Sequence, residues 1–499
     1  MDKRTNVNMI FSLLLQMVTI ISGFIIPREI LNAFGSQVNG LVSSITQFLN
    51  YISLVEGGVG SVLMALFYSP LSTRDKHGIS EIVVAGNKFF RKIAKIFLIY
   101  LVFLAFLYPF FIDSGFNYGY VSSLTLILGI ALFIQYYFSI IWKLMLQADG
   151  RVYVSSSIQI IVVVLNTVLT VVFIRLYPSI HIVKLIASAA YIIQPIAYEY
   201  YLKKHYDLDL SVKADPDLLE HRWDGFGINL AAFLNGNTDV IVLSFLSTLS
   251  NVSIYGIYNL VAMGLKSIIT SISAGITPSL GKLYALGHKD ELNSLLNKYE
   301  NLIFYITFSA YSCAILLIVP FVMVYTTGIY DANYNQPVFS CLLLLSAAVF
   351  CLREPYVNMA YVGNAFKPVS KFAYIEVIIN VVLSVIFVYS FGLNGVAMGT
   401  LVSMTVRTIY QVIFLKKNIV QRSPLLFILK GLMYVLTSCC GMLIAIKVVS
   451  YGDIASWGRW VFKAIMTALI IFGLNICGVI GAFKLDKRYI GKKCEVELN

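Results

Sequence analysis

Almost the whole chain consists of long apolar runs separated by short polar segments. A helix needs about 20 apolar residues to cross the hydrocarbon core of a bilayer, and fourteen runs reach or approach that length. The runs are continuous and too long for the short alternating strands of a barrel. They therefore predict transmembrane helices, in which every backbone polar group is satisfied internally. The predicted spans are 8–31, 41–68, 93–112, 121–146, 154–176, 180–201, 226–246, 252–276, 299–326, 337–361, 368–390, 394–416, 425–449 and 460–482.

The composition leads to the same conclusion. Only 12% of the residues are charged, 59% are apolar, and the mean hydropathy is +0.81. A soluble domain carries about 25% charged residues, so this chain has too few to cover a surface that faces water. The N-terminal MDKRTNVN passes directly into an apolar run without an A-x-A-like cleavage site, which indicates a first membrane span and not a signal peptide.

The loops are asymmetric in basic residues. If the N-terminus is cytoplasmic, the inner segments carry 25 Lys and Arg and the outer loops carry two, Arg175 and Arg459. The positive-inside rule predicts this asymmetry, and a wrong number of spans would scramble it. We therefore expect a multi-pass membrane protein with both termini in the cytoplasm. The net charge of +12 follows from the same rule, and because the basic residues are dispersed we expect no nucleic-acid partner.

Nothing in the sequence predicts a metal site, a nucleotide site or a catalytic triad. Six of the seven cysteines lie in apolar runs without metal-ligand spacing, and the five histidines form no HExxH motif. There is no Walker loop, and GGVG at 57–60 lies inside a predicted span, where we interpret it as helix packing. We therefore expect no cofactor. If such a membrane protein transports a substrate, the energy would come from an ion gradient, the membrane potential or the substrate's own gradient. H⁺ or Na⁺ would be the coupling ion.

One decapeptide returns almost half a chain later. LNTVLTVVFI occupies 165–174 and INVVLSVIFV occupies 379–388, with five of ten residues identical at an offset of 214. A weaker match relates Gly40 to Gly256 and Tyr68 to Tyr284 at an offset of 216. Six predicted spans separate the copies, and an even number preserves direction across the bilayer, so the repeat is parallel.

The repeat divides the chain into three parts. These are an N-lobe with helices 1–6 (1–215), a C-lobe with helices 7–12 (216–424), and helices 13–14 with a basic cytoplasmic tail (425–499). The polar connector 203–225 is the predicted hinge. Two-bundle transporters of this kind bind substrate between the halves and expose it alternately to the two sides.

Charged residues inside the predicted spans are the candidate functional residues, because a charge at mid-membrane is costly and usually faces a wet cavity or a partner. Four are basic and form a predicted basic chamber for an anionic head group: Arg28, Lys266, Arg353 and Arg407. Arginine offers phosphate a planar fork of donors. Three acids are candidates for ion coupling: Glu56, Asp239 and Glu376. Two further acids are the partners in helices 1 and 10: Glu29 and Glu354.

Each of these residues also has a structural interpretation. Arg28 and Glu29 could reach the interface, Glu376 could pair with a nearby cation, and Asp239 could stabilise the polar start of helix 7. Pro355 is expected to kink or unwind helix 10 next to Arg353 and Glu354. The repeated Asn166 and Asn380 are interpreted as helix-packing hydrogen bonds.

The sequence resembles a known family over nearly its whole length. Four stretches carry this resemblance. They are SGFIIPREILNAFGSQVNGLVSSITQFLNYISLVEGGVG (22–60), LMLQADGRVYVSSSIQIIVVVLNTVLTVVFI (144–174), NGNTDVIVLSFLSTLSNVSIYGIYNLV (235–261) and YVGNAFKPVSKFAYIEVIINVVLSVIFVYSFGLNGVAMGTLVSMTVRTIY (361–410). The chain resembles the multidrug/oligosaccharidyl-lipid/polysaccharide (MOP) exporter superfamily. Within that superfamily it resembles the Wzx-type flippases of the polysaccharide transporter family.

The resemblance implies an all-α fold of the MATE and MurJ type, with two lobes around a central cavity. It implies translocation of an undecaprenyl-pyrophosphate-linked oligosaccharide from the inner to the outer leaflet, for surface polysaccharide assembly, by a monomer. The implied partners are this lipid-linked oligosaccharide, the bilayer, and a polysaccharide polymerase and glycosyltransferases. Lipid II flippases of the superfamily use an Arg-acid pair in helix 1, which Arg28-Glu29 resembles, although Phe34-Gly35 follows sooner here than in that motif.

Three alternatives remain open. A MATE-type drug or cation antiporter shares the implied fold, but four intramembrane basic residues disfavour a cationic cargo. A membrane-embedded glycan polymerase or ligase would need a long outer loop, and every predicted outer loop is short. A channel would need a selectivity filter, and no loop resembles one. We therefore predict a transporter and not an enzyme.

Overall fold

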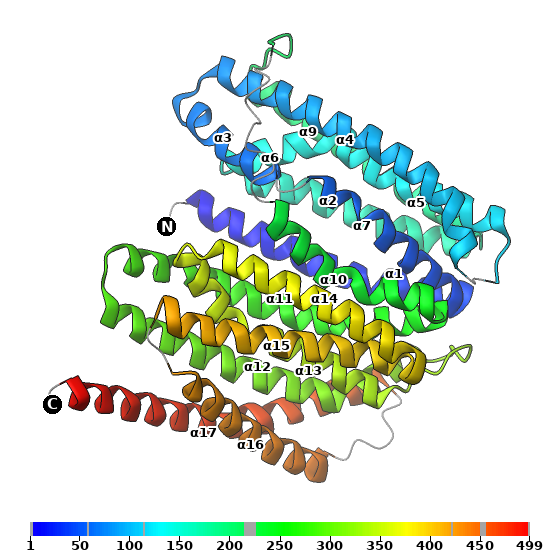
Figure 1. Ribbon diagram of the computed structural model, residues 1–499. Helices are drawn as coiled ribbons and strands as arrows, with labels where there is room; N and C mark the ends of the chain where they lie inside the picture. The colour runs from blue at the N-terminus through cyan, green and yellow to red at the C-terminus, as the bar shows by residue number, and fades with distance from the viewer. Residues whose placement is uncertain are drawn as a thin grey trace. The chain divides into compact units, whose positions relative to one another are not determined.

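A computed structural model describes residues 3–56, 59–112, 115–213, 226–420, 423–449 and 456–497. These residues are helical almost throughout and contain no strand (Figure 1). Twelve helical stretches are long and apolar enough to cross a membrane, and two shorter apolar helices span Val62–Thr73 and Gly236–Leu246. The predicted all-α polytopic fold is therefore confirmed.

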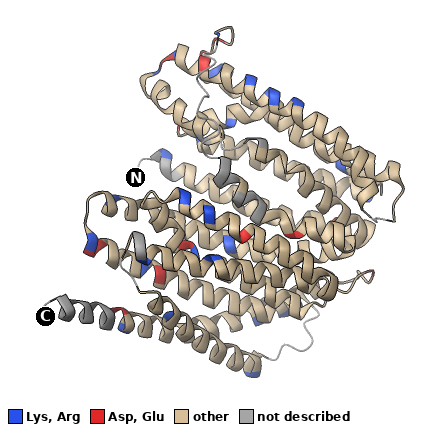
Figure 2. Ribbon diagram, viewed as in Figure 1, with Lys and Arg blue, Asp and Glu red and all other residues tan. Residues whose placement is uncertain are grey.

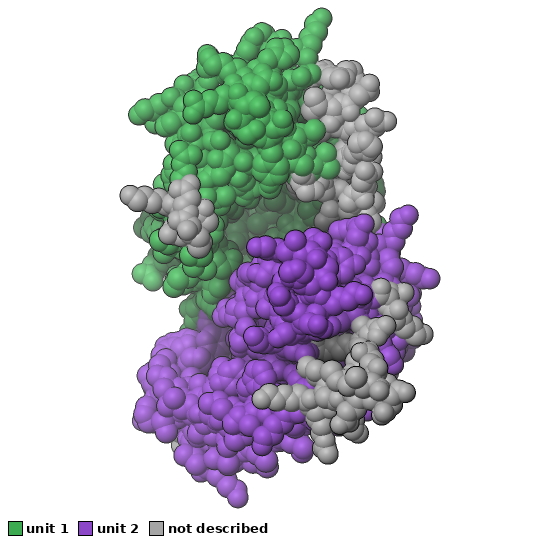
Figure 3. All heavy atoms as spheres, turned by 90° about the vertical axis from the view of Figure 1, so that its left-hand side faces the viewer, with its two compact units in different colours: residues 1–233, 248–253 green, residues 234–247, 254–499 purple. Residues whose placement is uncertain are grey.

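Residues 1–233 together with 248–253 form one compact unit, unit 1, and residues 234–247 together with 254–499 form a second, unit 2 (Figure 3). The predicted lobe boundary at 215/216 lies outside the described residues. Unit 1 contains helices α1 (Lys3–Leu49), α2 (Ile52–Glu56), α3 (Val59–Thr73), α4 (Lys76–Phe111), α5 (Tyr118–Ile134), α6 (Ile140–Ala148), α7 (Val152–Leu176), α8 (Ile180–Ala189) and α9 (Ile193–His205). A π-helical turn, η1 (Gln135–Ser139), joins α5 to α6, and a 3₁₀ turn, η2 (Ala190–Ile192), joins α8 to α9.

The remaining helices are α10 (Phe226–Leu246), α11 (Leu249–Ala285), α12 (Lys289–Tyr325), α13 (Pro337–Val362), α14 (Phe366–Phe391), α15 (Leu393–Asn418), α16 (Pro424–Val449) and α17 (Trp457–Glu497). Most of this set belongs to unit 2, but residues 248–253, which include the first turn of α11, belong to unit 1. In unit 2, α13 and α14 both pack on α15, and α16 and α17 pack on α12.

The beginning of the chain confirms the predicted separation of the first two spans. The spans 8–31 and 41–68 were predicted as two helices, and α1, although it carries one label, consists of two helices that meet at a kink between these spans. The backbone breaks inside it at Gly35, whose φ of 80° and ψ of 178° are not helical. Glycine adopts this positive φ without a steric penalty, so it permits a change of direction between the two helices. The rest of the predicted second span forms α2 and α3.

Of the two effects expected of Pro355, unwinding of the helix is wrong, and a kink stays a prediction. α13 contains Pro355 and continues to Val362. Proline lacks one backbone donor, but neighbouring helices and side chains can compensate for this inside a membrane protein. Arg353 and Glu354 are therefore held on a continuous helix.

An asparagine holds the start of α1 against the turn between α6 and α7. The Asn8 side chain donates to the Gly150 carbonyl at 2.8 Å and accepts from the Tyr153 backbone N–H at 2.9 Å. Next to it, Arg151 pairs with Asp149 at 2.7 Å. These contacts hold α1, α6 and α7 together at one end of unit 1.

Candidate functional site

Three of the predicted intramembrane charges meet in unit 2. Glu376 on α14 accepts from Arg353 Nη1 on α13 at 2.8 Å, and its other oxygen accepts from Arg407 Nη1 on α15. The Glu376 side chain is fully buried, and the two arginines are 2% and 9% exposed. One carboxylate therefore neutralises half of the charge of two buried guanidinium groups.

Lys266 on α11 lies beside this group without a carboxylate of its own. Its Nζ is 3.5 Å from the centre of the Phe350 ring, and the Arg353 guanidinium carbon lies 4.7 Å from the same ring. Among the described residues, no carboxylate comes within ion-pair distance of Lys266. An aromatic face attracts a cation but does not form an ion pair with it, so a ligand would not have to displace a carboxylate from Lys266.

Glu354, the predicted acid partner in helix 10, is the second carboxylate near these cations. It is within electrostatic reach of Arg353, Lys266 and Arg407, and Asn358 donates to it at 3.4 Å. The three cations therefore face two carboxylates, Glu354 and Glu376, and the group has an excess of one positive charge. Figure 2 shows basic and acidic positions close together on the helices of unit 2.

A second polar group in unit 2 surrounds Asp239 on α10. Thr400 on α15 donates to its two oxygens at 2.9 and 3.0 Å, and Tyr255 on α11 donates at 3.0 Å. Asn380 on α14 donates at 3.5 Å and accepts at 2.8 Å from Ser384. All of these residues are buried, and no cation within the described part of the chain pairs with Asp239. The group is a buried carboxylate among neutral oxygen and amide groups.

The two repeated asparagines have different environments. Asn166 donates to the Ala187 carbonyl at 3.0 Å, which links α7 to α8. The predicted packing role is therefore confirmed for Asn166. Asn380 donates to Asp239 at 3.5 Å, which links α14 to α10, so its hydrogen bond also joins two helices, but the acceptor is a carboxylate.

The remaining predicted residues lie in unit 1. Arg28 and Glu29 are partly buried on α1, two turns before the break at Gly35. Glu56 ends α2, and its side chain lies outside what the structure describes. Since Arg28 belongs to unit 1 and the other three basic residues to unit 2, the basic chamber formed by all four stays a prediction.

Sequence reasoning missed a third ionic group in unit 2. Lys430 on α16 contacts Glu300 on α12 at 2.7 Å and Asp486 on α17 at 2.8 Å. Tyr356 donates to Glu300, and Asn301 donates to Asp486 at 2.9 Å. Lys430 and Glu300 are fully buried, and the Asp486 side chain is 7% exposed. All three charges lie near the ends of predicted spans, where a charge looks like an ordinary interfacial residue.

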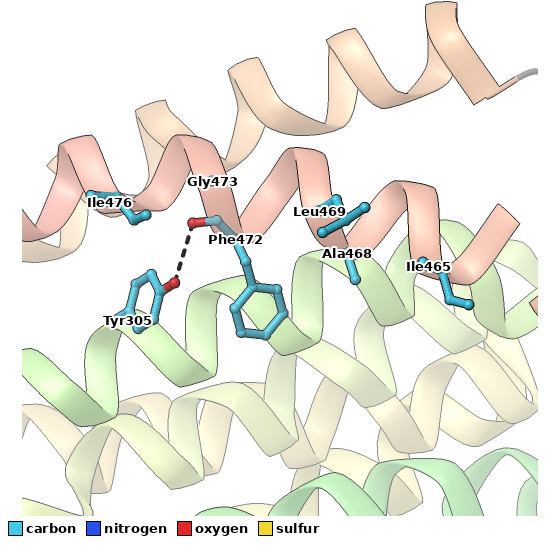
Figure 4. A pocket seen from close by; sticks show the side chains of 7 residues that line it. All are labelled: Tyr305, Ile465, Ala468, Leu469, Phe472, Gly473 and Ile476. Carbon is cyan, nitrogen blue, oxygen red and sulfur yellow. Dashed lines mark hydrogen bonds between the residues drawn. The ribbon is translucent and has the colours of Figure 1, made fainter. Parts of the chain in front are cut away.

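An apolar pocket of about 420 Å³ lies between α12 and α17 (Figure 4). It is lined by Tyr305, Ile465, Ala468, Leu469, Phe472, Gly473 and Ile476. The Tyr305 hydroxyl already donates to the Phe472 carbonyl at 3.3 Å. The pocket therefore suits hydrocarbon and is chemically distinct from the charged groups.

The fold and these buried charges define the class: a polytopic helical membrane protein with two compact units and ionic groups inside its helices. Comparison with solved structures shows which known proteins share this fold. The structure of the lipid II flippase MurJ in an inward closed conformation matches with a TM-score of 0.69 and 16% identity, over 94% of this chain and 100% of that one.

Transporters of a second kind also match. An inward-facing multidrug resistance MATE family transporter of the MOP superfamily matches with a TM-score of 0.62 and 17% identity, over 80% of this chain and 93% of that one. A MATE structure in the bent conformation matches with a TM-score of 0.54 and 16% identity, over 88% and 98%. No family model and no curated protein matches the chain. At these identities the likeness establishes a fold common to MurJ and MATE proteins, as the sequence resemblance implied.

Proposed function

We propose that the protein is a flippase that moves an undecaprenyl-pyrophosphate-linked oligosaccharide from the inner to the outer leaflet of the bacterial cytoplasmic membrane. The surface polysaccharide would then be assembled outside. The shared fold with a lipid II flippase supports a lipid-linked cargo, and the resemblance of the sequence to Wzx-type flippases supports the oligosaccharide. Without a nucleotide-binding motif, transport would proceed by alternating access and ion coupling.

The observation that carries the proposal is the excess positive charge around Phe350. Lys266 and Arg353 share its ring, and Lys266 has no acidic partner among the described residues. A partly buried cation without an ion pair is costly in a membrane, and a pyrophosphate group would balance the excess positive charge. Lys266 would contact the phosphate directly, whereas Arg353 and Arg407, held by Glu376, would keep the surrounding potential positive.

The coupling ion would bind at Asp239. An isolated buried carboxylate is strongly unfavourable, and a bound proton or Na⁺ would neutralise it. The carboxylate, hydroxyl and amide oxygens of Asp239, Thr400, Ser384 and Asn380 suit a hard cation. Glu376 is less suited to coupling because two arginines already neutralise it.

The same proposal includes cytoplasmic termini, a monomer, and cooperation with a polysaccharide polymerase and glycosyltransferases. The distribution of 25 inner and two outer basic residues supports the orientation. The lipid-linked substrate would come from glycosyl transfer on the cytoplasmic face, and a polymerase would use it outside.

A MATE-type drug or cation antiporter is the second candidate. It is supported by the fold shared with multidrug MATE transporters and by the buried acid Asp239, which suits cation exchange. The positive group around Phe350 argues against it, because that group would repel a cationic drug. A glycan polymerase or ligase is a weaker candidate, since the predicted outer loops leave little room for a catalytic site.

The test is a flipping assay in liposomes with a lipid-pyrophosphate-linked oligosaccharide. Lys266→Gln is expected to lower the rate roughly 10- to 100-fold, the effect of losing one charged hydrogen bond. Lys282→Gln, which removes an exposed charge from the same helix, is the control and should leave the rate unchanged. Equal rates for wild type and Lys266→Gln would remove Lys266 from the site. Absence of glycolipid flipping together with ethidium extrusion by cells would favour the antiporter.

A further inference from the structure

One face of α4 carries a stripe that the proposed transport function does not use. Four exposed cations lie at its start, and large exposed apolar side chains follow. The α4 stripe consists of Lys88, Arg91, Lys92, Lys95, Ile99, Val102, Phe103, Phe106 and Phe110. With 3.6 residues per turn, these positions lie within an arc of about 120° on one helix face. Figure 2 shows the row of basic positions along α4.

The opposite face of α4 is packed into unit 1. Ile82, Val83, Phe90, Phe97 and Leu101 are at most 4% exposed. On the stripe, by contrast, Ile99 is 72% exposed and Phe106 is 60% exposed. The stripe is therefore the side of the helix that faces the surroundings of unit 1.

The cations of the stripe are not neutralised by the protein. Among the described residues, no carboxylate lies within ion-pair distance of any of the four, and residues 88–111 contain no acid. The Arg91 guanidinium lies 5.3 Å from the centre of the Tyr137 ring, which orients it. A cluster of four or more Lys and Arg on a helix at the membrane surface is typical of anionic lipid binding.

The change from charged to apolar coincides with the expected edge of the membrane. The hydrocarbon core is about 30 Å thick, which corresponds to about 20 helical residues. Counting back from Phe111, where α4 ends, the core begins close to Lys92. The cations thus lie at head-group level on the side that the loop charges make cytoplasmic, and the apolar part continues along the hydrocarbon.

We propose that the α4 stripe is a binding site for an anionic phospholipid of the inner leaflet. The phosphate contacts Lys88, Arg91, Lys92 and Lys95, and an acyl chain lies along Ile99, Val102 and Phe106. An acyl chain extends through one leaflet, about 15 Å, and the apolar part of the stripe is long enough to cover it. The site is a helix face and not an enclosed groove, which suits an ordinary phospholipid better than a much longer polyprenyl chain.

Native mass spectrometry of the purified full-length protein tests this site without a transport assay. The probes are phosphatidylglycerol and, as the neutral reference, phosphatidylcholine. Each neutralised cation is expected to weaken phosphatidylglycerol binding about fivefold, the factor that corresponds to about 1 kcal/mol per basic residue. Lys88→Gln/Lys92→Gln/Lys95→Gln should thus bind it on the order of 100-fold more weakly, with unchanged phosphatidylcholine binding.

The matched control is Lys282→Gln/Lys289→Gln/Lys298→Gln, which removes the same charge from exposed positions of α11 and α12. It should bind phosphatidylglycerol like the wild type. Equal loss in both triple variants would mean that net charge alone attracts the lipid, and no loss in either would mean that the stripe is only solvated; both results overturn the site. Displacement of phosphatidylglycerol by equimolar polyprenyl diphosphate would overturn the phospholipid as its occupant. The single variant Lys92→Gln provides the same comparison if the triple variant is poorly folded. The result does not depend on whether the protein flips a glycolipid.

Discussion

The Asn39 side chain donates a 2.8 Å hydrogen bond to Ser253, the residue 214 positions later in the chain. The same offset of 214 residues separates the two similar decapeptides at 165–174 and 379–388. The contact therefore joins the segment next to Gly40 to the segment just before Gly256, two segments that the repeat relates. Both residues are buried, and both belong to unit 1, which includes residues 248–253 but not the rest of α11.

Gly40 allows this contact, and its replacement is the first prediction. A Cβ on Gly40 would lie well inside van der Waals distance of the Leu249 carbonyl oxygen, whereas a Cβ on its repeat counterpart Gly256 would meet nothing within 4 Å. Gly40→Ala should push the first turn of α11 away from α1 and destabilise the protein by about 1–3 kcal/mol, as overpacking does. Gly256→Ala is the matched control and should change little.

Disulfide cross-linking measures this displacement. In a background without the native cysteines, Asn39→Cys and Ser253→Cys should cross-link readily under oxidation. Adding Gly40→Ala should reduce the yield several-fold, and adding Gly256→Ala should not. Equal yields in the two backgrounds would contradict the tight approach at Gly40.

Glu376 should contribute strongly to stability, because it is the shared counter-ion of two buried arginines. Glu376→Gln leaves Arg353 and Arg407 buried without their shared carboxylate, and breaking a buried pair in this way costs about 3–5 kcal/mol. The loss should appear as a lower midpoint of thermal unfolding in detergent. Glu291→Gln, at an exposed position on α12, should leave the midpoint unchanged. A wild-type midpoint for Glu376→Gln would show that the two arginines are neutralised by other groups.

Asp239→Asn should separate ion coupling from folding. The amide keeps the size of the carboxylate and one oxygen for the Thr400 and Tyr255 donors, so the unfolding midpoint should stay within a few degrees. The variant no longer carries the charge that a proton or Na⁺ would neutralise. In liposomes, an imposed H⁺ or Na⁺ gradient should accelerate flipping by the wild type and should have no effect on the variant. A variant that responds to the gradient like the wild type would exclude Asp239 as the coupling residue.

The helical membrane fold could be predicted from the sequence because the length of each apolar run and the Lys and Arg of the loops carry most of the information. The break at Gly35 lies in the predicted gap at 32–40. The division of the predicted span 41–68 into the end of α1, α2 and α3 could not be predicted, because hydropathy does not specify where a helix ends within such a run. Arg353, Glu376 and Arg407 were found as candidates because each interrupts an apolar run. Which of them pair depends on how α13, α14 and α15 are rotated against one another, which no single sequence specifies.

Asp239 shows the same limit. Its place in a polar-flecked helix suggested either ion coupling or a stabilising role, and the sequence could not distinguish them. The structure adds that its partners Thr400, Tyr255 and Asn380 come from three other helices and are all neutral. The absence of a cation among its described partners comes from tertiary packing, which depends on residues up to 161 positions away.

Lys430 should be the residue that holds α16 and α17 to α12. Lys430→Met removes the one cation between Glu300 and Asp486 and leaves both carboxylates buried, so we expect a loss of about 3–5 kcal/mol in the free energy of unfolding. Adding Glu300→Gln and Asp486→Asn should recover much of this loss, because a neutral hydrogen-bonded group costs far less to bury than an unpaired charge. Thermal unfolding of the single and triple variants measures the coupling. Lys447→Met, an exposed position in the last turn of the same helix, is the control and should behave like the wild type. If Lys430→Met unfolds at the same temperature as Lys447→Met, the buried ionic group does not hold these helices, and their attachment to α12 rests on apolar contacts such as that of Phe304 with Tyr434.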